Sequence, residues 1–220
     1  MTELIGEIFS KIFNNNVMLA TLFVSMIPIM ELKGGIPFGM SNAFWGNKAL
    51  GQWGAFAWAY VGCCAVSVFL YFAFVPIMKL LRKSKIFKGL ANYVDNKVRR
   101  QSSKINQHGG EDSGNGASSN NVKKELLKML GVFVFVAIPL PLTGVWMGTC
   151  LAVVLGLNFW KTIISTFLGN LVAGIIISTI CVAFPQFTHW LIYGFLILVV
   201  LVVITEIIIN KLIKNKKEIK

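Results

Sequence analysis

The sequence predicts an all-α integral membrane protein of two inverted repeats, each a re-entrant helical hairpin plus a transmembrane helix. One additional C-terminal transmembrane helix and an N-terminal amphipathic helix complete this expected fold. Of the 220 residues, 55% are hydrophobic and only 14% are charged, whereas a soluble domain carries about a quarter charged residues. The uncharged stretches have the length that a bilayer requires, and two of them are interrupted by Pro and Gly. We therefore expect a single membrane domain over residues 1–220.

The first repeat is expected over residues 1–79. Residues 2–14 place apolar and polar side chains on opposite faces of a helix, which would lie in the membrane interface or pack against the other helices. The apolar segment 17–46 is interrupted by charge at Glu31 and Lys33, and residues 27–39 hold two prolines and three glycines. Neither apolar half reaches the roughly 20 residues of a span, so we expect two half-helices joined by unwound backbone. An uncharged span follows over residues 53–78.

The second half repeats this plan after a basic loop at 80–124. Within that loop, residues 101–122 are rich in Gly, Ser and Asn and are expected to form a flexible linker, because they have little apolar surface to bury. The second repeat is expected over 125–184, with a hairpin broken by the two prolines of 138–148 and a span over 162–184. Residues 185–220 would supply the last transmembrane helix and a basic tail.

The net charge of +12 is confined to two segments. Residues 79–128 hold twelve Lys or Arg and four Asp or Glu, residues 211–220 hold five Lys and one Glu, and the remaining charges cancel. Cytoplasmic loops of membrane proteins carry such an excess, so the basic loop 79–128 and the C-terminus are predicted to be cytoplasmic in a multi-pass plasma-membrane protein. Anionic lipids are the expected partners of both segments, and no nucleic-acid role is required. The two hairpins would then enter from opposite sides, as in many secondary transporters.

Glu31 and Lys33 are the first candidate site residues. An ionisable side chain at membrane depth is costly and usually marks an ion or proton pathway. The alternative is that the hairpin tip lies near the interface, where Glu31 only pairs with Lys33. Lys33 is equally compatible with binding an anionic substrate and with a structural role beside Glu31.

The remaining candidates are the residues expected to break the helices. Prolines prevent regular helix, and glycines let backbones approach closely. Unwound backbone at membrane depth is tolerated only where it is buried in protein or lines a cavity, so two matched breaks favour a substrate or ion site over simple kinks. Thr143 would hydrogen-bond a substrate or, preferably, another helix. The candidates are Pro28, Gly34, Gly35, Pro37, Pro139, Pro141, Thr143 and Gly144.

No enzyme signature, cofactor motif or metal-ligand spacing is found in the sequence. The four cysteines lie in apolar runs and are expected to be packing residues. We therefore expect a protein that is not an enzyme and uses no cofactor or metal. Any pumping would draw on an ion gradient.

Residues 28–37 (PIMELKGGIP) and 139–148 (PLPLTGVWMG) resemble the small multi-drug export protein family of bacteria, over residues 17–205 without the linker. More distantly, the two-hairpin plan resembles the DedA superfamily, whose members include lipid-carrier translocases and scramblases. That resemblance implies that Glu31 matches an acidic residue of the first hairpin. The arginine of the second DedA hairpin has no counterpart, because residues 138–156 carry no charge.

The sequence therefore predicts an ion- or proton-coupled secondary transporter that exports small molecules by alternating access between its hairpins, with Glu31 as the coupling group. A lipid-carrier (polyprenyl-phosphate) flippase or scramblase, with Lys33 at the headgroup, is one alternative. A non-transporting membrane scaffold is another. The sequence leaves the substrate, the coupling ion and the formation of a homodimer open.

Overall fold

The computed structural model describes residues 11–81, 116–140, 143–185 and Gly194. Residues 2–10 of the expected amphipathic helix, residues 101–115 of the linker, Pro141, and nearly all of the last span and tail lie outside these residues. Every regular element in the described part is helical. The elements are α2 (Val17–Met26), α3 (Glu31–Met40), α4 (Asn42–Trp45), the 3₁₀ turn η1 (Gly46–Lys48), α5 (Gln52–Leu81), α7 (Gly116–Ala137), α8 (Val145–Val154) and α9 (Phe159–Ala183).

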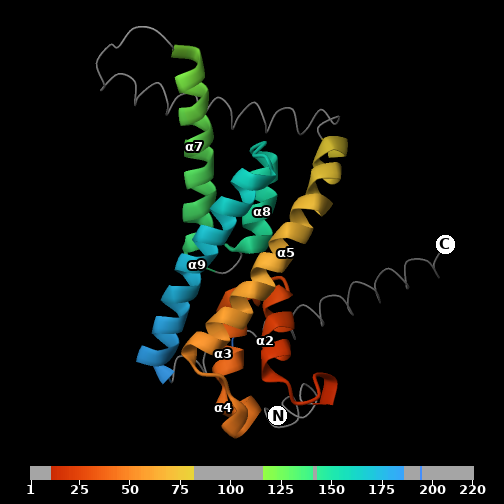
Figure 1. The fold of residues 1–220 in the computed structure, drawn as a ribbon, viewed down its shortest axis with the longest axis vertical. Coiled ribbons are helices and arrows are strands. Elements are labelled where there is room, and N and C mark those ends of the chain that lie inside the picture. Colours follow the sequence, from red (N-terminus) through yellow and green to blue (C-terminus); the bar gives the residue numbers. More distant parts are fainter. Residues whose placement is uncertain (1–10, 82–115, 141–142, 186–193, 195–220) are drawn as a thin grey trace, which may run out of the picture.

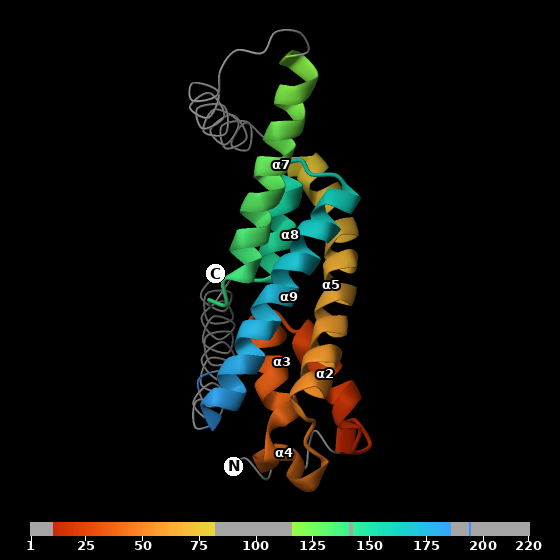
Figure 2. The ribbon, with the colours of Figure 1, turned by 60° about the vertical axis from the view of Figure 1, so that its left-hand side comes forward.

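The described helices form two pairs at opposite ends of the molecule. Figure 1 shows α2 and α3 in the lower half and α7 and α8 in the upper half, with α5 and α9 crossing between them. Helix α2 packs on α5 as α7 packs on α9, and both α3 and α8 pack against α5 and α9 together. Figure 2 shows α3 and α8 end to end, with the two long helices running past both. The ends of the two pairs therefore meet in the middle of the molecule.

Two helices in the described residues, Gln52–Leu80 and Phe159–Ala183, are long and apolar enough to cross a membrane. They coincide with the spans predicted at 53–78 and 162–184. Large side chains on both helices face outward: Phe69, Phe72 and Trp160 are 67%, 61% and 70% exposed. Such extensive apolar exposure is typical of a surface in contact with lipid or another apolar partner.

The long helices cross their partners at glycines. A Cβ on Gly62 of α5 would collide with the Leu22 carbonyl of α2, and a Cβ on Gly169 of α9 would lie 2.7 Å from the Phe133 carbonyl of α7. Each glycine is the eleventh residue of its helix. Small residues at such crossings let two backbones approach closely, which is how helices commonly pack in membranes.

The prediction that Pro37 prevents regular helix is wrong. The chain turns at residues 27–30, which include Pro28 as expected, but helix resumes at Glu31 and continues through Pro37 to Met40. A proline inside a helix costs about 3 kcal/mol because it removes a hydrogen bond and crowds the preceding turn. Every residue from Glu31 to Gly39 is buried, so tertiary packing outweighs this local preference.

The second break lies where the sequence predicts it, but the linker boundary is wrong. Helix α7 ends at Ala137 and α8 begins at Val145, which leaves Pro139 in the non-helical connection. At its other end α7 begins at Gly116, so residues 116–122 of the expected linker are helical. Extending an existing helix costs much less than nucleating one, and the packed part of α7 supplies the nucleus.

Candidate functional site

The first hairpin tip places Glu31 at the start of α3. Ile29 and Glu31 have φ angles of 77° and 43°. This left-handed conformation is uncommon for residues other than glycine, especially for a β-branched residue such as Ile29, and costs about 1–3 kcal/mol. The Glu31 N–H donates to the Ile27 carbonyl at 3.2 Å and so closes the turn. This conformation lets α3 reverse direction against α2 while its first side chain faces α8.

The second tip is stabilised by the hydroxyl of Thr143. Its single hydroxyl proton is shared between the carbonyls of Ile138 and Leu140, which lie 2.6 and 2.8 Å from Oγ1, and Oγ1 accepts from the Leu140 N–H at 3.0 Å. These contacts satisfy backbone groups that the end of α7 leaves without helical partners. The Thr143 side chain therefore maintains the tip, and its carbonyl remains available to the other hairpin.

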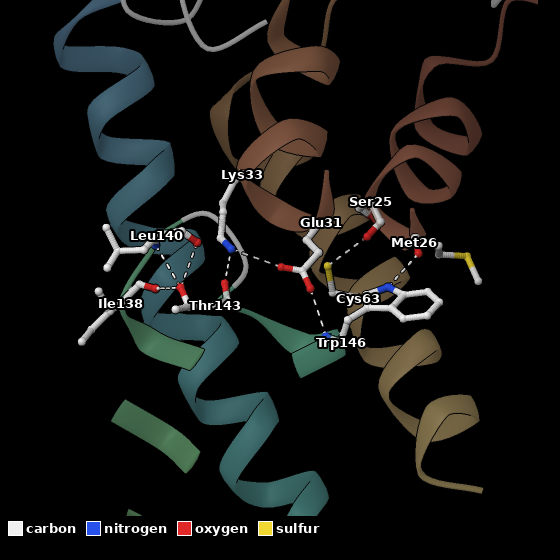
Figure 3. Close-up of polar contacts among 9 residues, drawn as sticks. All are labelled: Ser25, Met26, Glu31, Lys33, Cys63, Ile138, Leu140, Thr143 and Trp146. Atoms are coloured by element: carbon white, nitrogen blue, oxygen red, sulfur yellow. Dashed lines mark hydrogen bonds and ion pairs between the residues drawn. The ribbon is translucent and has the colours of Figure 1, made fainter. Parts of the chain in front are cut away.

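The carboxylate of Glu31 lies at the N-terminus of α8 (Figure 3). Its Oε1 accepts a hydrogen bond of 3.0 Å from the backbone N–H of Trp146, the second residue of that helix. Gly144, in the N-cap position, offers no side-chain cap, so Glu31 supplies from α3 the oxygen that a capping side chain usually provides. A negative charge at this position also interacts favourably with the helix dipole.

Lys33 completes the junction between the two tips. Its Nζ lies 3.3 Å from Glu31 Oε2 and also donates to the Thr143 carbonyl. Glu31 and Lys33 are only 5% and 6% exposed, and buried charges are tolerated only when they are paired and hydrogen-bonded. The pair is neutral overall and links α3 directly to the second tip.

Two further features bring the two tips close together. A Cβ on Gly144 would overlap Glu31 Oε2, so the carboxylate occupies the space that a larger residue would fill. The indole Nε1 of Trp146 donates to the Met26 carbonyl at 3.1 Å, at the last residue of α2. Both helices of the first pair are thereby hydrogen-bonded to the start of α8.

The structure brings four of the predicted residues together around one carboxylate: Glu31, Lys33, Thr143 and Gly144. The others lie elsewhere. Gly34 faces Met30, and Gly35 faces Ser25 and Ala59, so both serve helix packing. Pro28 lies in the first turn, Pro139 lies in the second break, Pro37 lies within α3, and Pro141 is outside the described residues.

Trp146 and Cys63 contribute to the site but were not predicted as site residues. The Cys63 thiol donates to the Ser25 carbonyl at 3.3 Å, and Figure 3 shows its sulfur next to the Glu31 carboxylate. For Trp146, the available signal was its position two residues after a glycine that follows a helix break, where backbone N–H groups are exposed. For Cys63 the sequence offers no such signal, because a cysteine in an apolar span is usually a packing residue.

The chemistry available at this junction is proton or ion exchange at a single carboxylate beside an ammonium group. Among the described residues, no group of three His, Cys, Asp or Glu side chains could hold a metal ion. An ionisable carboxylate at the contact between two helix pairs can link its charge state to their separation.

The comparisons with known proteins give one match. The sequence profile of the family described as "Putative small multi-drug export protein" matches residues 31–176, which include Glu31 and the rest of α3, the second tip and most of the two long helices. Neither the curated proteins nor the solved structures contain a match. The family and the two long apolar helices together indicate a membrane protein whose substrate is a small molecule. With about two-thirds of its length matched, the chain belongs to the small multi-drug export protein family.

Proposed function

We propose that the protein is an ion- or proton-coupled secondary exporter of small molecules. It works by alternating access between two re-entrant hairpins, α2–α3 and α7–α8, in a multi-pass plasma-membrane protein. The observation that carries this proposal is the buried carboxylate of Glu31, which joins one hairpin to the helix start of the other.

Protonation of Glu31 would weaken the contact between the hairpins. The ionised carboxylate attracts Lys33 and the positive end of α8, and hydrogen bonds to a charged acceptor are about twice as strong as neutral ones. The neutral acid loses both attractions. Because an ion shifts a conformational equilibrium only through different affinities for its two states, this difference is what a coupling group requires.

The helix crossings support an inverted repeat, with residues 1–79 and 125–184 as the two units. Gly62 approaches Leu22 of α2 as Gly169 approaches Phe133 of α7, at the same position in α5 and α9. The two hairpins point toward each other from opposite ends of the molecule (Figure 1). Secondary transporters built in this way hold their substrates where the broken helices meet.

The distribution of basic residues supports one orientation. Lys79 lies in the last turn of α5, Lys123 and Lys124 lie in the first half of α7, and Lys161 is the third residue of α9. The end of α5 and the starts of α7 and α9 lie in the upper part of Figure 1. Because positive residues are retained on the cytoplasmic side, this end is cytoplasmic. The α2–α3 hairpin then enters the membrane from the outside.

A second candidate function is the translocation of a lipid-linked phosphate. It is favoured by the donors that converge on the Glu31 carboxylate, namely the Lys33 ammonium and the Trp146 N–H. A phosphate oxygen would accept the same hydrogen bonds, because helix N-termini and lysines are common phosphate ligands. The transport test therefore includes both substrate classes.

The test is gradient-driven transport in proteoliposomes, with a panel of cationic drugs and polyprenyl phosphates. We expect the wild-type protein to move one class when a pH gradient is applied, and Glu31→Gln to abolish that movement while the protein remains folded. Glu125→Gln is the matched control, because it makes the same chemical change in an exposed ion pair with Lys161. It should transport like the wild-type protein.

The substrate class follows from which ligand responds. Movement of polyprenyl phosphate alone would favour the second candidate function. If the wild-type protein moves neither class, or if Glu31→Gln transports as well as the wild-type protein, Glu31 is not a coupling group. The hairpins would then be structural, as in a membrane scaffold.

A further inference from the structure

A chain of buried hydroxyls connects α8, α5 and α9. Thr149 Oγ1 lies 3.1 Å from Ser67 Oγ, which lies 3.1 Å from Thr166 Oγ1, and the Thr166 hydroxyl donates to the Thr162 carbonyl at 2.9 Å. A carbonyl can only accept, so Thr166 uses its proton there, Ser67 donates to Thr166, and Thr149 donates to Ser67. All three of these side chains are fully buried.

Polar side chains continue from this chain toward Glu31. Cys63 is one helical turn before Ser67 on α5, and Asn170 is one turn after Thr166 on α9, so the two form the next layer. The Cys63 thiol donates to the Ser25 carbonyl at 3.3 Å, and Figure 3 shows its sulfur next to the Glu31 carboxylate. We call Thr162, Thr166, Ser67, Thr149, Asn170 and Cys63 the polar file.

The polar file contains buried atoms that have no partner among the described residues. These are Nδ2 of Asn170 and Oγ1 of Thr162, together with the neighbouring Oγ of Ser165, all from side chains no more than 3% exposed. A buried polar atom without a partner costs about 1–3 kcal/mol, and ordered water normally satisfies it. The unpartnered atoms of Asn170 and Thr162, at the two ends of the α9 part of the polar file, are therefore expected to bind water.

We propose that the polar file is a hydrated route by which protons reach Glu31 from the end of the molecule where α9 begins. This inference rests on the proposed function for the role of Glu31. Because the hydroxyls at rest donate toward the Thr162 carbonyl, each O–H must first rotate toward the Glu31 side. Each water or hydroxyl then accepts a proton on its oxygen from the preceding group and releases its own to the next. The last group releases its proton to the Glu31 carboxylate and neutralises it. The proton that enters the route at the other end comes from bulk water. From Thr162 to Asn170 the route follows eight residues of α9, or about 12 Å.

The titratable groups around the polar file indicate Glu31 as the proton acceptor at the end of this route. Lys33 and Cys63 are the titratable groups that face Glu31 from α3 and α5. Helix α2 has no titratable side chain, α8 has only Cys150, and α9 has Lys161 at its start and Cys181 near its end. Glu31 is therefore the one carboxylate that the described part of the chain places beside the file.

The test is a stopped-flow pH jump on the full-length protein in lipid nanodiscs, followed by the fluorescence of Trp146. The part of the fluorescence change that Trp146→Phe removes is the Trp146 signal. The part of this signal that Glu31→Gln removes is the part that depends on Glu31. Thr166→Val keeps the volume of the side chain but interrupts the hydroxyl chain. We expect it to slow the fluorescence change tenfold or more without reducing the final amplitude.

Matched controls separate an interrupted route from a damaged fold. Thr166→Ser retains the hydroxyl and should restore the wild-type rate. Thr179→Val makes the same change on the exposed face of α9, where Thr179 bonds only to its own helix among the described residues, and should leave the rate unchanged. Thr149→Val, on α8, should slow the change as Thr166→Val does.

The possible failures are distinguishable. If Thr166→Val and Thr149→Val retain the wild-type rate with the full amplitude, protons reach Glu31 by another path. The route is then overturned, while the coupling role of Glu31 stands. If the wild-type protein shows no fluorescence change that Glu31→Gln removes, Glu31 takes up no proton, and both the route and the coupling group are overturned.

Discussion

At the scale of single residues, the junction depends on the absence of a side chain at Gly144. The φ angle of Gly144 is 167°, an extended conformation open to any residue, so the requirement for glycine is steric. The carboxylate of Glu31 occupies the position of the missing Cβ. Glu31 can therefore cap α8 only while residue 144 remains a glycine.

We predict that Gly144→Ala destabilises the protein by about 1–3 kcal/mol, the usual cost of overpacking a buried site. Thermal unfolding in detergent should show a lower midpoint. Gly131→Ala is the control, because Gly131 lies in α7 with nothing within 4 Å of its added Cβ, and Ala favours helix over Gly by up to about 1 kcal/mol. In a Glu31→Ala background the cost of Gly144→Ala should largely disappear. An equal cost in both backgrounds would contradict the steric account.

The sequence predicts the charged residues of the site better than its hydroxyls. Glu31 and Lys33 stand out because charge within an apolar segment is rare and costly. Ser67, Thr149 and Thr166 do not stand out, because a hydroxyl in a membrane helix can bond to its own backbone, as Thr179 does. The hydrogen bonds between the three helices depend on the relative rotation of the helices, which only the tertiary structure defines.

At the scale of helices, the ends of the short helices are capped by side chains from elsewhere. The Trp146 indole caps the end of α2, the Trp45 indole donates to the Phe38 carbonyl near the end of α3, and the Lys128 ammonium donates to the Leu155 carbonyl after α8. A helix that ends inside a membrane leaves carbonyls that water cannot reach. The Trp146 cap explains how α2, a half-length helix, can end in the middle of the molecule.

We predict that Gly62→Ala and Gly169→Ala each lower the thermal unfolding midpoint, and by similar amounts. Each added methyl meets a backbone carbonyl, which cannot rotate away as a side chain can, so about 1–3 kcal/mol is expected for each change. Gly54→Ala is the control within α5, where the nearest atom would lie 3.7 Å away. A loss in only one of the two variants would indicate that the crossings are not equivalent.

The helix boundaries show where sequence reasoning succeeds and where it does not. The breaks near Pro28 and Pro139 are predictable, because local chemistry and segment length indicate the same result. The continuation of α3 through Pro37 is not predictable, because it depends on packing around a fully buried helix. The start of α7 at Gly116 is likewise not predictable, because the helix extends from its apolar part into a polar segment.

At the scale of the whole molecule, the two hairpins and the two long helices form one connected unit. The long helices contact both hairpins and so connect one hairpin to the other. The polar file lies on the side of the second hairpin, and the contacts of Met26 and Ser25 lie on the side of the first. Buried hydroxyls also lie in the first hairpin, at Thr21 and Ser25, so polar groups are present on both sides of Glu31.

The proposed inverted arrangement predicts that the two ends of the described structure lie on opposite sides of the membrane. Lys48 follows α4 at one end, and Lys123 lies near the start of α7 at the other; both are exposed. In a chain with its four cysteines replaced, Lys48→Cys should react in intact cells with a thiol reagent that cannot cross the membrane. Lys123→Cys should react only after the membrane is permeabilised. If both react in intact cells, or neither does, the two hairpins do not enter from opposite sides. The basic segments would then not determine the orientation, and alternating access between the hairpins would lose its structural basis.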